Sequence, residues 1–246
     1  MPNLLINIDH VATLRNARRE SFPDPVAVAL ECEQAGADGI VFHLREDRRH
    51  ISDQDVERLK LQTQTKLDFE LSLAPDIVTI CCRTVPELAT LVPERREEVT
   101  TEGGLDVVSQ IGRVKQIAKR LYDSGIKEVA LFLDPSLDQM DAAAESGANV
   151  VELHTGDYAN AQGPGARESV LDALAAAARR AHENGLIVHA GHGLDYDNFP
   201  LFSERVPYIR EVSIGFAVIA RSLFVGISNA VKEMLSVVKP PEARNY

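Results

Sequence analysis

Short apolar runs, rich in β-branched residues, alternate with longer segments of helical periodicity along the whole chain. The apolar runs predict eight strands, at residues 4–10, 39–45, 66–72, 89–94, 128–134, 150–155, 186–190 and 211–215. Between them the periodicity predicts helices at 24–35, 52–63, 107–124, 137–146 and 168–184. This alternation is typical of a parallel α/β protein.

Several predicted helices end at a glycine that a tight turn connects to the next strand, as at Gly36 and Gly147. Eight such steps, with no linker or low-complexity break, favour one domain over residues 1–246, a (β/α)8 TIM barrel with additional helices. An open doubly wound sheet would carry a glycine-rich phosphate turn after its first strand. The chain has Asp-His-Val-Ala at 9–12 instead, which disfavours that alternative.

Ionisable and amide side chains gather near the carboxyl end of nearly every predicted strand. Side chains two apart on a strand point to the same side, so His43 and Arg45 share one face while Phe42 and Leu44 share the other. The inward side at this end is where barrel enzymes place their chemistry. If these side chains only filled the barrel interior, their burial would cost free energy, because a buried charge needs a compensating partner. The set predicts an active-site mouth: Asn7, Asp9, His10, His43, Arg45, Asp68, Glu70, Glu94, Asp134, Glu152, His154, His189 and His192.

Phosphate binding is the second chemistry that the pattern indicates. Arginine clusters follow the first two strands, and glycines stand in the loops after the last two, a frequent phosphate site in barrels. The loop 93–106, charged and ending in paired glycines, is typical of a lid that excludes water. The residues are Arg15, Arg18, Arg19, Arg45, Arg48, Arg49, His50, Gly191, Gly193 and Gly215.

Composition narrows the function further. A net charge of −11 argues against nucleic acid as a partner, and the absence of a signal peptide or long apolar run argues against a membrane and predicts a cytoplasmic protein. The histidines leave a catalytic metal as a competing hypothesis, although no H-x-H or H-E-x-x-H pattern supports it. A Schiff-base lysine is disfavoured because no predicted strand ends in lysine.

Five runs of the chain resemble the pyridoxine 5′-phosphate synthase family. They read Asn-Ile-Asp-His-Val-Ala-Thr-Leu-Arg-Asn-Ala-Arg at 7–18, His-Leu-Arg-Glu-Asp-Arg-Arg-His-Ile at 43–51, Leu-Val-Pro-Glu at 91–94 with Glu-Val-Thr-Thr-Glu-Gly-Gly at 98–104, His-Thr-Gly at 154–156, and Ala-Gly-His-Gly-Leu at 190–194. The resemblance extends from the first predicted strand to the last. It implies condensation of 1-deoxy-D-xylulose 5-phosphate with 3-amino-2-oxopropyl phosphate to pyridoxine 5′-phosphate, phosphate and water, with no cofactor and no metal.

The resemblance also implies roles for individual residues. His43 and Glu70 are expected as bases and His192 as the acid that assists departure of leaving groups. The residues expected around the substrates are Asn7, Asp9, His10, Arg18, Arg45, His50, Thr100, Gly193, Gly215 and Phe216, and strand parity adds Glu152. A homo-oligomer built from dimers, an octamer, is the implied assembly.

Two positions depart from the family pattern. Phe216 stands where a histidine is common, and His189 stands where an asparagine is expected. Two other functions remain open at this point: another phosphosugar-processing barrel enzyme, such as an isomerase or aldolase, and a catalytically silent barrel that binds a phosphorylated metabolite.

Overall fold

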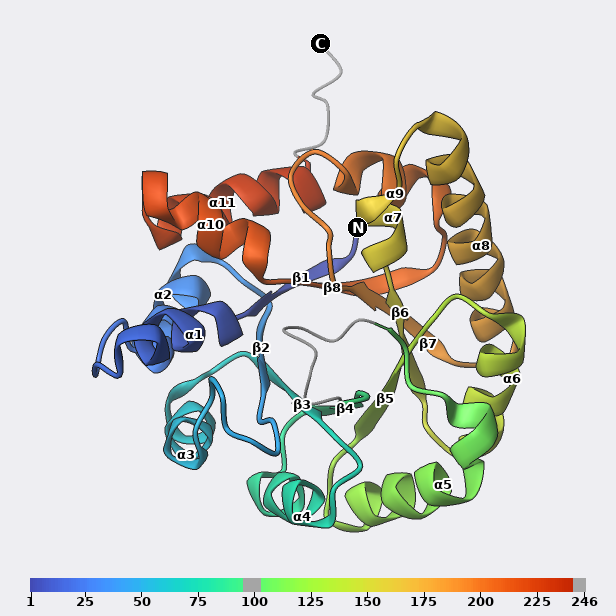
Figure 1. Ribbon diagram of the computed structural model, residues 1–246, viewed down its shortest axis with the longest axis horizontal. Coiled ribbons are helices and arrows are strands. Elements are labelled where there is room, and N and C mark those ends of the chain that lie inside the picture. Colours follow the sequence, from blue (N-terminus) through green and yellow to red (C-terminus); the bar gives the residue numbers. More distant parts are fainter. Residues whose placement is uncertain (95–102, 241–246) are drawn as a thin grey trace.

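Eight parallel strands form a closed barrel in the computed structural model, which describes residues 1–94 and 103–240 (Figure 1). The strands pair in chain order and β8 closes on β1. The predicted (β/α)8 barrel is therefore confirmed. The strands are β1 (Asn3–Asn7), β2 (Gly39–His43), β3 (Lys66–Leu71), β4 (Leu88–Leu91), β5 (Glu128–Leu133), β6 (Val150–His154), β7 (Ile187–Gly191) and β8 (Ile209–Ile214).

The helices lie outside the barrel and cover it (Figure 1). Local sequence sets where several begin: Asp24 caps one helix directly before a proline, and Ser52 and Asp55 form a capping box at the next. The helices are α1 (Asp9–Arg18), α2 (Pro25–Ala35), α3 (Asp53–Gln62), α4 (Pro75–Thr84), α5 (Val107–Asp123), α6 (Leu137–Ser146), α7 (Gly156–Asn160), α8 (Pro164–Glu183), α9 (Phe199–Arg205), α10 (Phe216–Val225) and α11 (Ile227–Val238).

Three predicted strands continue too far. Asp9 and His10 are the first residues of α1, Arg45 follows the end of β2, and Glu94 follows the end of β4. Alternation of polar and apolar residues continues past the ends of β1 and β2, which is why the pattern alone did not reveal these two boundaries. The side chains still lie at the barrel mouth, because the chain leaves each strand there.

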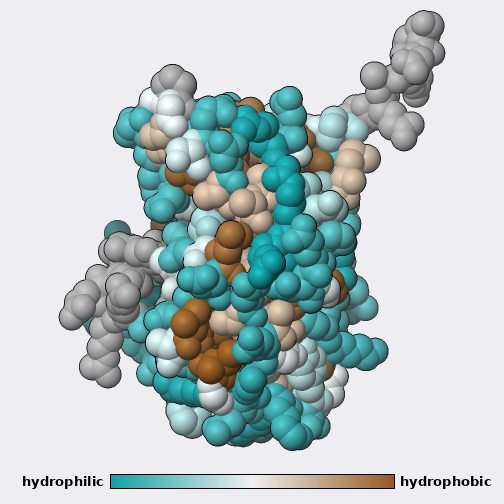
Figure 2. All heavy atoms as spheres, turned by 90° about the vertical axis from the view of Figure 1, so that its right-hand side faces the viewer, coloured by the Kyte–Doolittle hydropathy of each residue, from teal (hydrophilic) through white to brown (hydrophobic). Residues whose placement is uncertain are grey.

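An apolar shell packs between strands and helices. Phe42 and Phe69 lie in it with ring centroids 4.7 Å apart, and Leu44 is fully buried there, as parity predicted. On the outer surface, the face that carries α6 and α8 is mostly hydrophilic with smaller apolar groups between (Figure 2). None of the helices in the described ranges combines the length and apolar composition that crossing a bilayer requires.

The inside of the barrel is largely polar. Lys66, from the start of β3, binds Glu128 at 2.5 Å and Glu211 at 2.7 Å, and Arg210 pairs with Glu128 from the same end. The His189 ring lies one layer closer to the mouth, with Nε2 3.5 Å from Oε2 of Glu211. Charged and hydrogen-bonding groups thus continue from the amino-terminal end of the barrel towards the mouth.

Candidate active site

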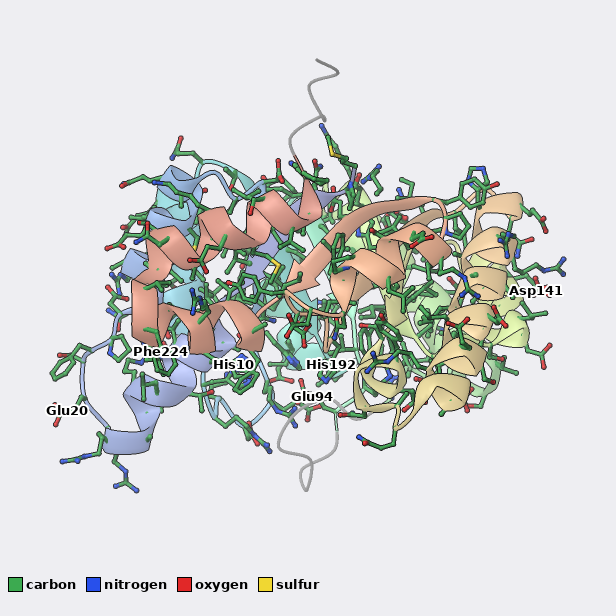
Figure 3. All side chains as sticks on the ribbon, turned by 90° about the horizontal axis from the view of Figure 1, so that it is seen from above. His10, Glu20, Glu94, Asp141, His192 and Phe224 are labelled. Atoms are coloured by element: carbon green, nitrogen blue, oxygen red, sulfur yellow. The ribbon has the colours of Figure 1, made fainter. Side chains whose placement is uncertain are left out.

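His10, Glu94 and His192 lie together at one end of the barrel, whereas Asp141 lies far out on the helical layer (Figure 3). The first three come from α1 and from the segments after β4 and β7, so strands distant in sequence meet here. This end is the carboxyl end of the strands, as the sequence predicted.

His43 closes β2 and is paired with Glu94. Its Nε2 lies 2.8 Å from Oε1 of Glu94, and both side chains are buried. The second Glu94 oxygen accepts the backbone N–H of Glu46 at 3.1 Å and lies 3.9 Å from Nε of Arg45. Burial alone would raise the pKa of Glu94, but the bond to His43 and these neighbours outweigh it, so the pKa lies below its usual value. A carboxylate-paired imidazole of this kind suits a general base.

Asp9 connects the first two strands of the mouth. Its Oδ1 accepts the backbone N–H of His43 at 2.9 Å and lies 3.8 Å from Nδ1 of His50, while its own N–H donates to Asn7. The ligand atoms of Asp9, His43 and His50 lie within 4.8 Å of one another, the only such group of three in residues 1–94 and 103–240. Two histidines and a carboxylate suit a transition metal. The nearby arginine cation, at Arg45, opposes one.

Two buried carboxyls form the floor of the site. Burial, and then the negative charge of Glu152, raise the pKa of Glu70 well above its usual value. Burial, and then the charges of Asp68 and Glu211, raise the pKa of Glu152 to about 8. Asn7 lies 3.4 Å from Glu70, at the edge of hydrogen-bond distance. Glu152 therefore holds a proton near neutral pH, and burial shifts the pKa of Glu70 in the same direction.

His192 lies on the opposite wall in a left-handed backbone conformation, with φ of 71°, and is followed by Gly193 at φ of 105°. Thr155 donates its hydroxyl to the carbonyl oxygens of Gly191 and His192, both at 2.9 Å. Burial, and then the charges of His154 and His10, lower the pKa of His192 to about 4. The His192 imidazole is therefore neutral at neutral pH.

His154 and Asp134 extend this wall. The Nδ1 of His154 lies 3.0 Å from Oδ1 of Asp134, and the rings of His154 and His192 have centroids 5.2 Å apart. Both residues belong to the polar set at the strand ends, but neither was assigned a role. Their paired geometry, which depends on the three-dimensional proximity of β5, β6 and the segment after β7, carries no local sequence signal.

His10 and His189 complete the imidazoles near the mouth. His10 lies against Phe216, with ring centroids 5.4 Å apart, and burial lowers its pKa. His189 is buried below the mouth, beside Glu152 in the strand register, and burial lowers its pKa well below the usual value. The unexpected His189 therefore belongs to the interior rather than to the mouth.

The glycines at the predicted phosphate site have structural reasons. Gly215 precedes α10, whose first turn has no side-chain cap and so offers backbone N–H groups at a helix amino terminus. A Cβ on Gly215 would lie 3.0 Å from Cβ of Asn7, and one on Gly193 would lie 2.8 Å from Cβ of Ala159. Backbone thus approaches backbone at both positions.

The arginine clusters divide into two groups. Arg15 forms a two-pronged pair with Asp55, Arg48 pairs with Asp53, and Arg49 pairs with Asp47, so these cations stabilise the loops. Their prediction as phosphate ligands is not supported. Arg45 is buried at the mouth and His50 lies beside Asp9, as predicted.

Arg18 lies apart from the other predicted site residues. It ends α1 and is exposed, nine residues beyond Asp9, which corresponds to about 13 Å along a helix. Thr100 and most of the predicted lid, 95–102, fall outside the described residues. Of the lid's described part, Gly104 donates its N–H to Asp134 at 2.9 Å.

Comparison with known families decides the relationship. The family described as "Pyridoxal phosphate biosynthesis protein PdxJ" matches residues 4–240. This chain belongs to that family. Its relatives include the pyridoxine 5′-phosphate synthase of Salinibacter ruber, 62% identical over 97% of this chain and 98% of that protein, and that of Chlorobium phaeobacteroides, 52% identical over 96% and 99%. The resemblance inferred from the five sequence runs is confirmed.

Solved structures similar to this PdxJ-family chain support the fold alone. Thiamine phosphate pyrophosphorylase from Pyrococcus furiosus aligns with a TM-score of 0.61 at 14% identity, over 97% of this chain and 95% of its own. Phosphoribosylanthranilate isomerase from Thermotoga maritima aligns with a TM-score of 0.57 at 15% identity, over 97% and 99%.

Proposed function

We propose that this chain is a pyridoxine 5′-phosphate synthase. It condenses 1-deoxy-D-xylulose 5-phosphate with 3-amino-2-oxopropyl phosphate and releases pyridoxine 5′-phosphate, phosphate and water. The carrying observation is the convergence of His43, Glu70 and His192 in one mouth beside backbone N–H groups suited to phosphate. Imine formation, proton shuffling, loss of phosphate and ring closure need several acid–base groups rather than an electron carrier.

His43 and Glu70 act as the bases. Pairing with Glu94 orients the His43 imidazole. Burial raises the pKa of Glu70 well above its usual value. The ammonium group of the amine substrate would lower that pKa again, since a nearby cation favours the carboxylate. Glu70 thus becomes a base when the substrate is present.

His192 acts as the acid. In the empty site its pKa of about 4 leaves it neutral at pH 7. A substrate phosphate bound beside Gly193 and Gly215 brings negative charge to this wall, and negative charge favours the imidazolium. The proton that assists the leaving group is therefore acquired once substrate is bound.

The substrates are held by residues at three places around the mouth. Asn7, Asp9, Arg45 and His50 follow the first two strands, Glu152 forms the floor, and Gly193 with Gly215 provides backbone donors. Phe216 and His10 form an aromatic edge beside the last phosphate site. Roles for Arg18 and Thr100 remain predictions from the sequence.

The protein acts in the cytoplasm as a transferase-type synthase without a metal, and as a homo-oligomer, an octamer built from dimers. Exposed apolar side chains on α10 and α1, among them Leu14, Phe216, Leu223 and Phe224, support self-association, and Phe224 lies at the outer edge in Figure 3. Its cysteines are unbridged, as is usual in a reducing compartment. Light scattering on wild type and Phe224→Glu tests the assembly, and a monomeric wild type contradicts it.

The decisive experiment mixes chelator-treated protein with both substrates and follows pyridoxine 5′-phosphate and phosphate together. Equal appearance of the two products is expected. Activity that returns only with a divalent ion would assign the Asp9, His43 and His50 group to a metal. Binding of the phosphosugar without turnover would favour the silent barrel.

A further inference from the structure

The end of β6 contacts the segment of His192 at three consecutive residues. The His154 ring meets the His192 ring edge to face, at 5.2 Å and 67°. Thr155 donates its hydroxyl to the carbonyl oxygen of His192. Gly156 packs against Gly193, since a Cβ built on Gly193 would lie 3.5 Å from the Cα of Gly156. These contacts make His154-Thr155-Gly156 the support on which His192 rests.

His192 needs such support because of its backbone. A non-glycine residue at φ of 71° is in the left-handed region, which is unfavourable and persists only where neighbours hold it. Thr155 holds the carbonyl side of this conformation. The ring contact with His154 then limits where the His192 imidazole can turn.

His154 is itself fixed on several sides. Its Nδ1 is bonded to Asp134, and Phe132 lies against its ring at 5.1 Å. A Cβ on Gly156 would lie only 2.4 Å from its Nε2, so the ring occupies the space that glycine leaves. The His154 side chain is 8% exposed and has little freedom to rotate.

Asp134 gives this arrangement a charge. The hydrogen bond from His154 is the main cause that lowers the pKa of Asp134, so the carboxylate is ionised at neutral pH. Its Oδ1 lies 3.0 Å from Nδ1 of His154, whose ring in turn contacts the ring of His192. After burial, His154 and His10 are the neighbours that lower the pKa of His192, and Glu152 lies beside Gly191.

We propose that His154, held by Asp134, is a positioning residue for His192. The pair fixes the plane of the His192 imidazole through the contact between the two rings. The inference rests on the proposed function only in taking His192 as the acid of the reaction.

The test replaces Asp134 by Asn, which keeps a carbonyl oxygen for His154 and for the Gly104 N–H but removes the charge. The pKa of His192 is followed by NMR in substrate-free protein, together with kcat and the KM of each substrate. Without the anion that holds it, the His154 ring turns away from His192, and the pKa of His192, which His154 helps to lower, rises by about one unit. We expect kcat to fall about tenfold with both KM values nearly unchanged, and Asp134→Glu to restore part of it.

Asp141→Asn is the matched control. Asp141 also pairs with a cation, Arg180, but lies on the outer helical layer, so its loss leaves the pKa of His192 and kcat unchanged (Figure 3). The inference is overturned if Asp134→Asn leaves the pKa of His192 in place, whether or not activity falls with the folded fraction. Because the titration needs no turnover, a shifted pKa in a protein that makes no pyridoxine 5′-phosphate supports the pair and counts against the proposed function alone.

Discussion

The Oε1 atom of Glu152 occupies the space in which a side chain at Gly191 would begin. A Cβ built on Gly191 would lie 2.0 Å from that oxygen, well inside van der Waals contact. The last residue of β7 is therefore a glycine, because the carboxyl group of Glu152 on β6 fills the space that a side chain would need. The floor of the active site depends on this absence of a side chain.

Replacing Gly191 by alanine should displace the Glu152 carboxyl. A misplacement of about 1 Å at a catalytic site costs about 10²-fold in rate, and overpacking destabilises by about 1–3 kcal/mol. Steady-state kinetics and urea unfolding measure the two effects. Gly112→Ala, where an added Cβ meets no atom within 4 Å, is the control and should retain full activity. Equal behaviour of the two variants would contradict the steric argument.

Removing the Glu94 charge should impair His43. Glu94→Gln keeps the size of the side chain but loses the carboxylate that is hydrogen-bonded to the His43 imidazole and orients it. We expect kcat to fall about 10²-fold with smaller changes in KM, measured as pyridoxine 5′-phosphate formation. Glu31→Gln, exposed on α2, serves as the control for the same chemical change. A kcat within twofold of wild type would show that Glu94 does not assist His43 as the base.

Stability should fall as pH rises through neutrality, owing to Asp68. Burial raises the pKa of Asp68 to about 7, above its usual value of 3.8, so the folded protein binds more protons than the unfolded chain between these values. The contribution of Asp68 to the free energy of unfolding is full below pH 4 and is lost progressively towards pH 7. The total loss is on the order of a few kcal/mol. Urea unfolding from pH 5 to 8 measures the slope. Asp68→Asn should flatten it, and an unchanged slope would assign it to other groups.

Phosphate should return a proton to His192. The pKa of about 4 in the empty site reflects burial and two neighbouring imidazoles, and a bound dianion opposes both. Saturating inorganic phosphate should therefore raise the pKa of His192 in an NMR titration by more than about one unit. The alkaline pKa in the pH profile of kcat should then lie above the pKa of His192 in the free enzyme. An unmoved pKa, with binding verified by phosphorus NMR, would remove His192 from the acid role.

The sequence predicted the barrel, because a period of two marks strands and their inward faces locally. The predicted positions of the strand ends were less accurate, since Asp9 continues the alternation of β1 although it begins α1. The partners of Arg15 and His43 could not be predicted. Asp55 and Glu94 lie 40 and 51 residues away, and only closure of the barrel brings them into contact.

The polar interior alters the usual division of the barrel into a working end and a supporting end. In this fold the amino-terminal end of the strands ordinarily affects stability alone. Here Glu211 is bound by Lys66 at that end and raises the pKa of Glu152 at the other. A substitution of Lys66 thus changes the electrostatics of the catalytic floor without touching it. Variation at the closed end of the barrel is a means of tuning the pH at which this enzyme works.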